Sequence, residues 1–258
     1  MSTSTTPSPQ PLVSVIIPTY NRFNYLLNAV ASVKAQTYPN VEIIIVNDCS
    51  TQPEYYTNGD NPILKGCNIL HLAKNSKETF GFACAGFVRN KGFAIAEGEY
   101  IAILDDDDCW IPNKLEIQIS EMIKSQALIS STDAFTGNGA FDPSKEYPIY
   151  INQLNFDYTI NRFIQLGKSH LLNNNPITNK KSIPAKITHE MLYINNVLIA
   201  SSVVISKKLM SALGGMKHVK NADEDFDYWL RATKITPALF IQQPLIYYDQ
   251  GHGDGRLY

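Results

Sequence analysis

The sequence predicts a single α/β domain in which helices flank a Rossmann-like, mostly parallel central sheet. Three observations predict this fold class. Apolar strand patterns alternate with helical patterns through the N-terminal part of the 258-residue chain. Alternation of this kind builds parallel strands joined by right-handed crossovers. Three of the strand patterns also end in polar clusters, and ligands of such sheets bind at the carboxyl ends of the strands.

The first strand is expected at residues 13–17, a β-branched run that Pro18 should stop. A helix should follow the turn at 18–22, because apolar residues recur there at helical spacing. Those residues are Leu26, Leu27, Val30 and Val33. The elements expected next are strands at 41–46, 68–72 and 100–104 and an Ala/Gly-rich helix at 83–96.

Beyond Trp110 the pattern is less regular. An amphipathic helix is expected at 112–124, with Pro112 in the first turn, where its missing N–H has no partner to lose. Residues 133–190 are rich in Asn, Pro and Lys and show little periodicity, so they are expected to form binding loops or a lid. Regular structure should return as a strand at 203–205 and a helix at about 225–232.

Composition and charge exclude several classes of protein. A hydrophobic content of 44% and a charged content of 18% are ordinary for a soluble protein. The net charge of −2 gives no general attraction to nucleic acid, and no apolar run approaches the roughly 20 residues that span a bilayer. Contact with a membrane surface stays open. Residues 1–11 are expected to form a flexible tail and lack the pattern of a signal peptide. Four scattered cysteines indicate reduced thiols and a cytoplasmic location.

Four consecutive aspartates, Asp105 to Asp108, follow the strand expected at 100–104. Adjacent carboxylates repel one another and raise one another's pKa, so a fold tolerates such a cluster best when a cation offsets the repulsion. Mn²⁺ and Mg²⁺ prefer carboxylate oxygens, and Mg²⁺ usually binds substrate phosphates as well. The cluster therefore indicates a metal–diphosphate site. Capping of the following helix is the alternative, although a cap needs only one aspartate.

Four motif segments follow one another along the chain. They are SVIIPTYNR (14–22), VNDCS (46–50), RNKGFAIAEGEYIAILDDDDCW (89–110) and EDFDYWLR (224–231). Together they resemble the inverting family 2 glycosyltransferases, which have the A-type glycosyltransferase fold. The resemblance implies one domain over residues 12–258, with a nucleotide-sugar-binding half at 12–108 and an acceptor-binding, catalytic half at 109–258. It is weakest between residues 133 and 190.

The activity that this resemblance implies is transfer of a sugar from a nucleoside-diphosphate donor to an acceptor hydroxyl, with a UDP- or dTDP-sugar favoured. The acceptor could be a glycan, a lipid-linked sugar or a protein. Asp107 corresponds to the family's metal-binding aspartate, and Asp105 and Asp106 would hold the ribose or share the metal. His252 is a further candidate ligand for Mn²⁺ or Mg²⁺, because neutral imidazole can bind manganese. Arg256 is an alternative group for the diphosphate.

The nucleotide-sugar site is expected to include Pro18, Thr19, Tyr20, Arg22, Asp48 and Arg89 besides Asp105 and Asp106. Asp48 resembles the aspartate that accepts a pyrimidine N–H, with a turn-stabilising role as the alternative. Tyr20 is expected against the base. Arg22 and Arg89 are candidates for the diphosphate, because guanidinium groups pair with phosphate oxygens. A solvated surface position is the alternative for each arginine.

Direct displacement at the anomeric carbon requires a base for the acceptor hydroxyl and positive charge for the departing diphosphate. The resemblance assigns the base to Asp225. Three apolar residues of its segment share one helical face, so the helix can pack in the core while Asp225 faces the cleft. They are Phe226, Trp229 and Leu230. A plain interaction of Asp225 with the helix dipole is the alternative, and Asp223 and Glu224 lie close enough to compete for the role.

Two other functions fit parts of the pattern. A sugar-nucleotide nucleotidyltransferase would carry a glycine-rich loop after the first strand, where this chain has residues 18–22. A non-catalytic nucleotide- or glycan-binding module would be expected to lose the aspartate cluster or Asp225, and both are present. Sugar choice is expected to depend on residues 195–202 and on the irregular 133–190 stretch.

Overall fold

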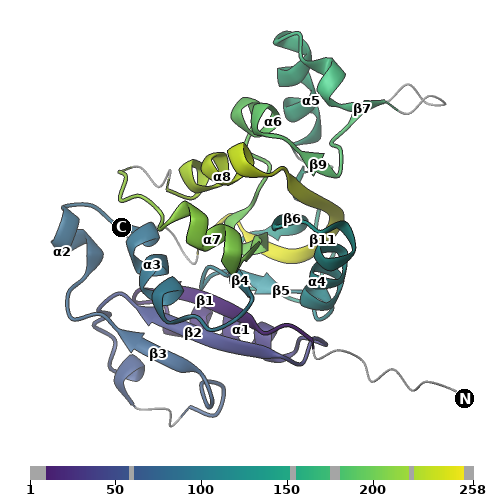
Figure 1. The fold of residues 1–258 in the computed structure, drawn as a ribbon. Coiled ribbons are helices and arrows are strands. Elements are labelled where there is room, and N and C mark those ends of the chain that lie inside the picture. The colour runs from purple at the N-terminus through teal and green to yellow at the C-terminus, as the bar shows by residue number, and fades with distance from the viewer. Residues whose placement is uncertain (1–9, 58–60, 152–154, 175–180, 221–223, 253–258) are drawn as a thin grey trace, which may run out of the picture.

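A mostly parallel sheet lies at the centre of this computed structural model, which describes residues 10–57, 61–151, 155–174, 181–220 and 224–252 (Figure 1). The strands are β1 (Val13–Thr19), β2 (Val41–Asn47), β3 (Asn68–His71), β4 (Tyr100–Ile103), β5 (Cys109–Trp110), β6 (Ile129–Gly137), β9 (Lys186–Ile187), β10 (Val204–Ser206) and β11 (Ala238–Asp249). Their order is β3-β2-β1-β4-β10-β6-β11-β5, with β9 paired to β11. The pairings give β1, β2, β3, β4, β6 and β11 one common direction.

Helices cover both faces of this sheet and create two hydrophobic cores. Helices α1 (Phe23–Lys34) and α4 (Lys114–Ser125) share one core. The other core contains residues of α3 (Ala85–Ile95), α5 (Phe156–Gln165), α6 (His189–Ile194), α7 (Lys207–Leu213) and α8 (Glu224–Ile235). Strand β1 serves both cores, because Ile17 points into the first and Ile16 into the second. This arrangement confirms the predicted fold class.

The remaining elements are short. They are α2 (Ser76–Phe80), the paired strands β7 (Asn173–Asn174) and β8 (Lys181–Ser182), and the 3₁₀ helices η1 (Pro53–Tyr56), η3 (Ser169–Leu171) and η4 (Ala200–Ser202). The predicted tail lies outside the described residues up to residue 9. The carbonyls of Gln10 and Pro11 accept hydrogen bonds from Asn40 and Tyr38. Among the described residues, no helix is long and apolar enough to cross a membrane.

Two expectations about proline are wrong. Strand β1 does not stop at Pro18, which pairs in register with Val46 of β2. The Ile16 carbonyl accepts from Leu104 on the β4 side, and Pro18 faces the same side beyond the last paired residue of β4, so its missing N–H breaks no ladder. Pro112 is not in the first turn of α4, because that helix begins at Lys114.

The expectation that residues 133–190 are irregular is wrong in part. Strand β6 extends into this stretch as far as Gly137, helix α5 lies within it, and α6 begins at its end (Figure 1). Strand β6 carries consecutive polar residues that are fully buried, namely Ser130, Ser131, Thr132 and Asp133. Strand β11 was not predicted either. Its pairing with β6 shifts register on both sides of Pro244, and these irregularities accommodate a proline inside a strand.

Candidate functional site

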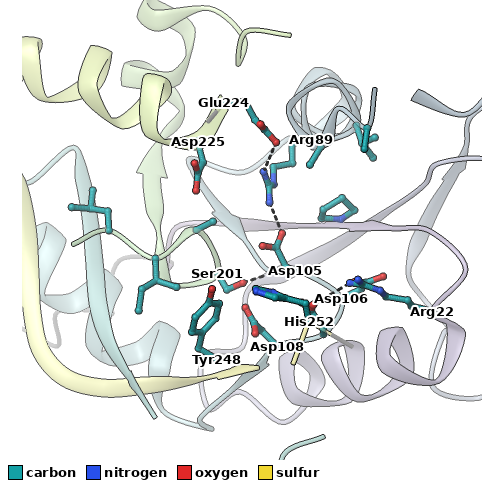
Figure 2. Close-up of a pocket in the computed structure, with 18 of the residues that line it drawn as sticks. Arg22, Arg89, Asp105, Asp106, Asp108, Ser201, Glu224, Asp225, Tyr248 and His252 are labelled. Carbon is teal, nitrogen blue, oxygen red and sulfur yellow. Dashed lines mark hydrogen bonds and ion pairs between the residues drawn. The ribbon is translucent and has the colours of Figure 1, made fainter. Parts of the chain in front are cut away.

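A cavity of about 820 Å³ opens where β1 and β4 end (Figure 2). Pro18 and Arg22 come from the end of β1 and the turn after it, and the four aspartates from the loop after β4. Arg89 of α3 and the first two residues of α8, Glu224 and Asp225, form another part of the wall. Polar clusters that are far apart in sequence therefore meet at the carboxyl edge of the sheet, as the topology predicts.

Two arginines hold the aspartate loop. Nη1 of Arg22 lies 3.2 Å from Oδ1 of Asp106 and 3.0 Å from Oδ2 of Asp107. Nη2 of Arg89 lies 2.5 Å from Oδ1 of Asp105, and Nη1 of Arg89 lies 3.7 Å from Oε1 of Glu224. Figure 2 shows Arg89 between Glu224 and Asp105. Each arginine thus links two carboxylates.

Asp108 has a different role from its neighbours. It is 1% exposed, and its Oδ1 accepts a hydrogen bond of 2.8 Å from the backbone N–H of Asp249 at the end of β11. This bond fixes the aspartate loop to the far strand of the sheet. Asp108 therefore holds the loop in place, whereas the three aspartates before it form ion pairs with the two arginines.

Burial and mutual repulsion raise the pKa values of three of these carboxylates, and the paired Arg22 offsets this only in part. Burial raises the pKa of Asp106 to about 6, and Arg22 only partly offsets it. Burial and then the charge of Asp106 raise the pKa of Asp107 to about 7. The pKa of Asp108 lies well above its usual range, through burial and the charge of Asp107. An additional cation would lower the pKa of all three carboxylates.

The residues fit a hard divalent cation by their chemistry. Six carboxylates line the cavity, whereas Arg22 and Arg89 supply the cations paired with them. Oδ2 of Asp106 is buried and has no hydrogen-bond partner among the described residues. Within the same residues, no three His, Cys, Asp or Glu side chains are grouped to hold a metal ion. Water or the phosphates of a bound donor would have to complete the coordination, as is usual for Mg²⁺.

Asp225 stands across the cavity from the aspartate loop (Figure 2). Burial raises its pKa to about 6, and the Arg89 charge works in the opposite direction. Helix α8 holds it in place, because Tyr228 and Trp229 are fully buried in the core. Glu224 is instead turned toward Arg89, so Asp225 is the carboxylate of this pair that is left to face the cavity (Figure 2). Phe226 is only partly buried against the core.

Three predicted nucleotide-site residues do not line the cavity. Asp48 is fully buried, and its carboxylate accepts hydrogen bonds from the backbone and hydroxyl of Ser76 and from Asn75. Burial raises its pKa, and Ser76 lowers it. Thr19 is buried with its hydroxyl 2.6 Å from that of Tyr55. Tyr20 is half-buried beside it. Asp48 thus supports the start of α2.

His252 does line the cavity, near the aspartates, whereas Arg256 lies outside the described residues (Figure 2). The His252 backbone has φ of 51°, and its N–H donates to the carbonyl of Asp249 at 3.2 Å. This tight turn follows directly on β11. The structure thus brings the candidate ligands Asp107 and His252 to one cavity.

Sequence reasoning missed Ser201, which joins the two ends of the aspartate loop. Its hydroxyl accepts from the backbone N–H of Asp105 at 3.0 Å, and its carbonyl accepts from the indole N–H of Trp110 at 2.8 Å. Its neighbours in the 195–202 region also line the cavity, and selection of the sugar by this region stays a prediction. They are Asn196, Leu198, Ile199 and Ala200. Nothing in the sequence distinguishes Ser201 from the adjacent Ser202 as the serine with this role.

Lysines on the cavity wall were missed as well. Lys77 of α2 and Lys220 line the cavity, are exposed, and make no ion pair with the described residues. Their segments touch, because the rings of Phe80 and His218 lie 4.7 Å apart. These lysines offer positive charge to an incoming ligand.

Solved structures share this fold. S. aureus TarS 1–349 in complex with UDP-GlcNAc is 18% identical, and the match covers 96% of this chain and 62% of that chain with a TM-score of 0.64. A mannosyltransferase from Pyrobaculum calidifontis in complex with GDP-Man and Mn²⁺ is 16% identical, with coverages of 94% and 58% and a TM-score of 0.61. At these identities the likeness shows the fold alone, and the fold is that of A-type glycosyltransferases.

The sequence itself assigns the family. Residues 14–183 match the family described as glycosyl transferase family 2. A UDP-Glc:α-D-GlcNAc-diphosphoundecaprenol β-1,3-glucosyltransferase of Escherichia coli is 30% identical over 227 residues, which cover 86% of this chain and 70% of that protein. The chain therefore belongs to glycosyl transferase family 2, which confirms the resemblance and the class of enzyme.

Other relatives match over a shorter region. A protein named for colanic acid biosynthesis as a glycosyl transferase in Escherichia coli strain K12 is 35% identical over 146 residues, or 54% of this chain and 49% of that protein. The matched part spans 46% of a further relative. The chain thus spans about half the length of these two relatives.

Proposed function

We propose that this chain is a metal-dependent inverting glycosyltransferase that moves a sugar from a UDP- or dTDP-sugar to an acceptor hydroxyl. The observation that carries the proposal is the pairing of two carboxylate sites across one cavity. The carboxylates of the aspartate loop are only partly neutralised, which suits a metal–diphosphate. They face Asp225, a carboxylate suited to act as a base. The groups for the leaving diphosphate and the base for the acceptor hydroxyl thus lie on opposite walls of the cavity.

The acceptor side of the reaction is assigned to Asp225. Its carboxylate accepts the proton of the acceptor hydroxyl as that oxygen bonds to the anomeric carbon, and the bond to the diphosphate breaks on the opposite side of the sugar. Glu224 and Arg89 position Asp225 by fixing the start of α8 against α3. An attack from the side opposite the leaving group inverts the anomeric configuration.

The donor side is assigned to the aspartate loop and Arg22. Asp107, with His252 as a second candidate, would hold Mn²⁺ or Mg²⁺, and the bound cation would supply positive charge to the departing diphosphate. Asp105 and Asp106 are assigned to the ribose or to the same cation, and Pro18 to the wall beside them. Arg89 stays with Asp105 and Glu224, because its guanidinium already joins them.

For the acceptor we favour a lipid-linked sugar that bears phosphate. One relative, whose match covers 86% of this chain, is named for transfer to a diphosphoundecaprenol-linked sugar. Lys77 and Lys220 supply two cations on the cavity wall that the described carboxylates do not pair. An acceptor with a phosphate near its sugar would meet these lysines while its hydroxyl meets Asp225.

The test is turnover of candidate nucleotide sugars with membrane extracts or lipid-diphosphate sugars as acceptors. Transfer should stop with a chelator, return with Mn²⁺ or Mg²⁺, and be absent in Asp107→Asn. The new linkage should have the anomeric configuration opposite to that of the donor, as read from the proton coupling by NMR. Full activity in a chelator would contradict the metal role, and retained configuration would contradict the single displacement.

A further inference from the structure

Arg22 occupies an unusual position for a residue assigned to the donor. A single nitrogen, Nη1, bridges Asp106 at 3.2 Å and Asp107 at 3.0 Å. The side chains are 10% exposed for Arg22, 7% for Asp106 and 8% for Asp107. A cation placed between two buried carboxylates stands where a metal ion would gain most from the same charges. Arg22 therefore neutralises the loop in the absence of metal.

The backbone of Arg22 is held by hydrogen bonds, whereas its side chain lines the cavity. The N–H donates to the hydroxyl of Tyr55 at 3.1 Å, and the carbonyl accepts from the N–H of Leu26 at 2.9 Å in the first turn of α1. The guanidinium lies on the cavity wall. A shift of Arg22 away from Asp107 thus requires new side-chain torsions and no rearrangement of β1 or α1.

We propose that Arg22 competes with the divalent cation for Asp107, so that metal binding releases the guanidinium to the diphosphate of the donor. The cation and the guanidinium carry like charges and cannot both sit on Oδ2 of Asp107. Once displaced from Asp107, the Arg22 side chain still lines the cavity that receives a diphosphate, with which a guanidinium pairs well. Metal and donor then bind with positive coupling. This inference rests on the proposed metal-dependent function.

The competition is tested by Mn²⁺ binding to the nucleotide-free protein, measured by electron paramagnetic resonance of the free ion. Arg22→Gln should bind Mn²⁺ about tenfold more tightly than the wild type, since the competing charge is gone. With Mn²⁺ saturating, the same variant should bind UDP about tenfold more weakly. Lys77→Gln is the matched control, because it removes one cavity cation that does not contact Asp107. Its Mn²⁺ affinity should stay within about twofold of the wild type.

Two results would overturn the inference. Mn²⁺ binding to Arg22→Gln that is no tighter than in the wild type would make Arg22 a support of Asp107, and equal gains in Arg22→Gln and Lys77→Gln would make the effect one of general charge. Asp107→Asn separates this failure from that of the proposed function, because unchanged Mn²⁺ binding there removes the metal site itself. If Arg22→Gln does not fold, a wild-type crystal structure with Mn²⁺ decides. Nη1 of Arg22 should then lie beyond the roughly 4 Å of an ion pair from Oδ2 of Asp107, and a retained pair refutes the competition.

Discussion

At the residue scale, the environment of Asp225 determines both its protonation and its reach. Burial is the largest influence and raises its pKa to about 6, with the Arg89 charge acting against it. A raised pKa means that the proton is held more tightly, so the basic carboxylate forms only as the pH rises through about 6. Below that pH the group cannot accept a proton from the acceptor hydroxyl.

The Asp225→Asn substitution should therefore lower kcat by about 100-fold or more, the lower end for a positioned general base. The amide nearly preserves the shape of the side chain but has no basic oxygen. In the wild type, kcat/KM should fall about tenfold for each pH unit below about 6, and the residual rate of the variant should lose this dependence. Stopped-time assays from pH 5 to 8 measure both. Donor binding should stay within about twofold, and a near-wild-type rate would remove Asp225 from the role of base.

Residues in the aspartate loop show where sequence reasoning stops. The strand-end position and the acidity of residues 105–108 are visible in the sequence, because both are local. Their partners are not, since Arg22, Arg89 and Asp249 come from the turn after β1, from α3 and from β11. Asp48 illustrates the same limit. The turn after β2 was predicted, but the bonds to Ser76 depend on how α2 folds back onto that turn.

At the scale of elements, helix α2 depends on Asp48 through three hydrogen-bond donors from Asn75 and Ser76. If Asp48 contacts the base directly, Asp48→Ala should weaken UDP binding by about 1–3 kcal/mol while Ser76→Ala leaves it nearly unchanged. If Asp48 acts only by holding α2, whose Lys77 lines the cavity, the two variants should weaken binding to a similar extent. Calorimetric titration of each variant with UDP separates the two cases. Equal affinity before and after Asp48→Ala would contradict the assignment to the nucleotide site.

Helix α3 can lie close to β1 because it has a glycine at the point of contact. A Cβ on Gly92 would lie 2.5 Å from Cγ2 of Ile16, a fully buried residue. Gly92→Ala should therefore destabilise the fold by about 1–3 kcal/mol through overpacking, although alanine is the better helix former. Urea unfolding measures the change. The free energy of unfolding of Ala94→Ser, on the exposed side of the same helix, should stay within about 0.5 kcal/mol of the wild type. A Gly92→Ala variant more stable than the wild type would contradict the close packing of α3 on β1.

The strands that were predicted differ from the strand that was missed in the kind of side chain that they bury. Strands β1, β2 and β4 are mostly apolar, so their burial is visible in the sequence. Strand β6 is buried with Ser131 facing Ser202 and with Ser130 accepting from Gln118, and these partners come from η4 and α4. A polar strand satisfied by distant side chains looks like a loop in the sequence.

At the scale of the whole molecule, the sheet ties the two walls of the cavity into one structure. Strand β10, which follows residues 195–202, pairs with β4 on one side and β6 on the other. Strand β11 in turn pairs with β6 and holds Asp108 through Asp249. The strands of residues 12–108 and those of residues 109–258 thus form one sheet, and binding at their junction should stabilise the entire fold.

Ligand binding at this junction should therefore raise the melting temperature of the protein as a whole. A ligand at 100 times its Kd stabilises a protein by about 2.7 kcal/mol, which for a chain of this size corresponds to roughly 5–10 °C. UDP or dTDP with Mn²⁺ should produce such a shift, GDP with Mn²⁺ a smaller one, and each nucleotide with a chelator little or none. The reason is that the carboxylates of the loop repel a bare diphosphate, whereas a cation on Asp107 reverses the local charge.

The matched control for this measurement is Asp107→Asn, which removes one carboxylate of the loop and keeps the shape of its side chain. Its melting temperature without ligand should be at or above that of the wild type, because the substitution relieves repulsion among buried acids. Its shift with UDP and Mn²⁺ should largely disappear. Differential scanning fluorimetry at fixed pH and ligand concentration compares the two proteins directly. A shift of equal size in the wild type with and without Mn²⁺ would show that the nucleotide binds without the metal, and a larger shift with GDP than with UDP would contradict the proposed choice of donor.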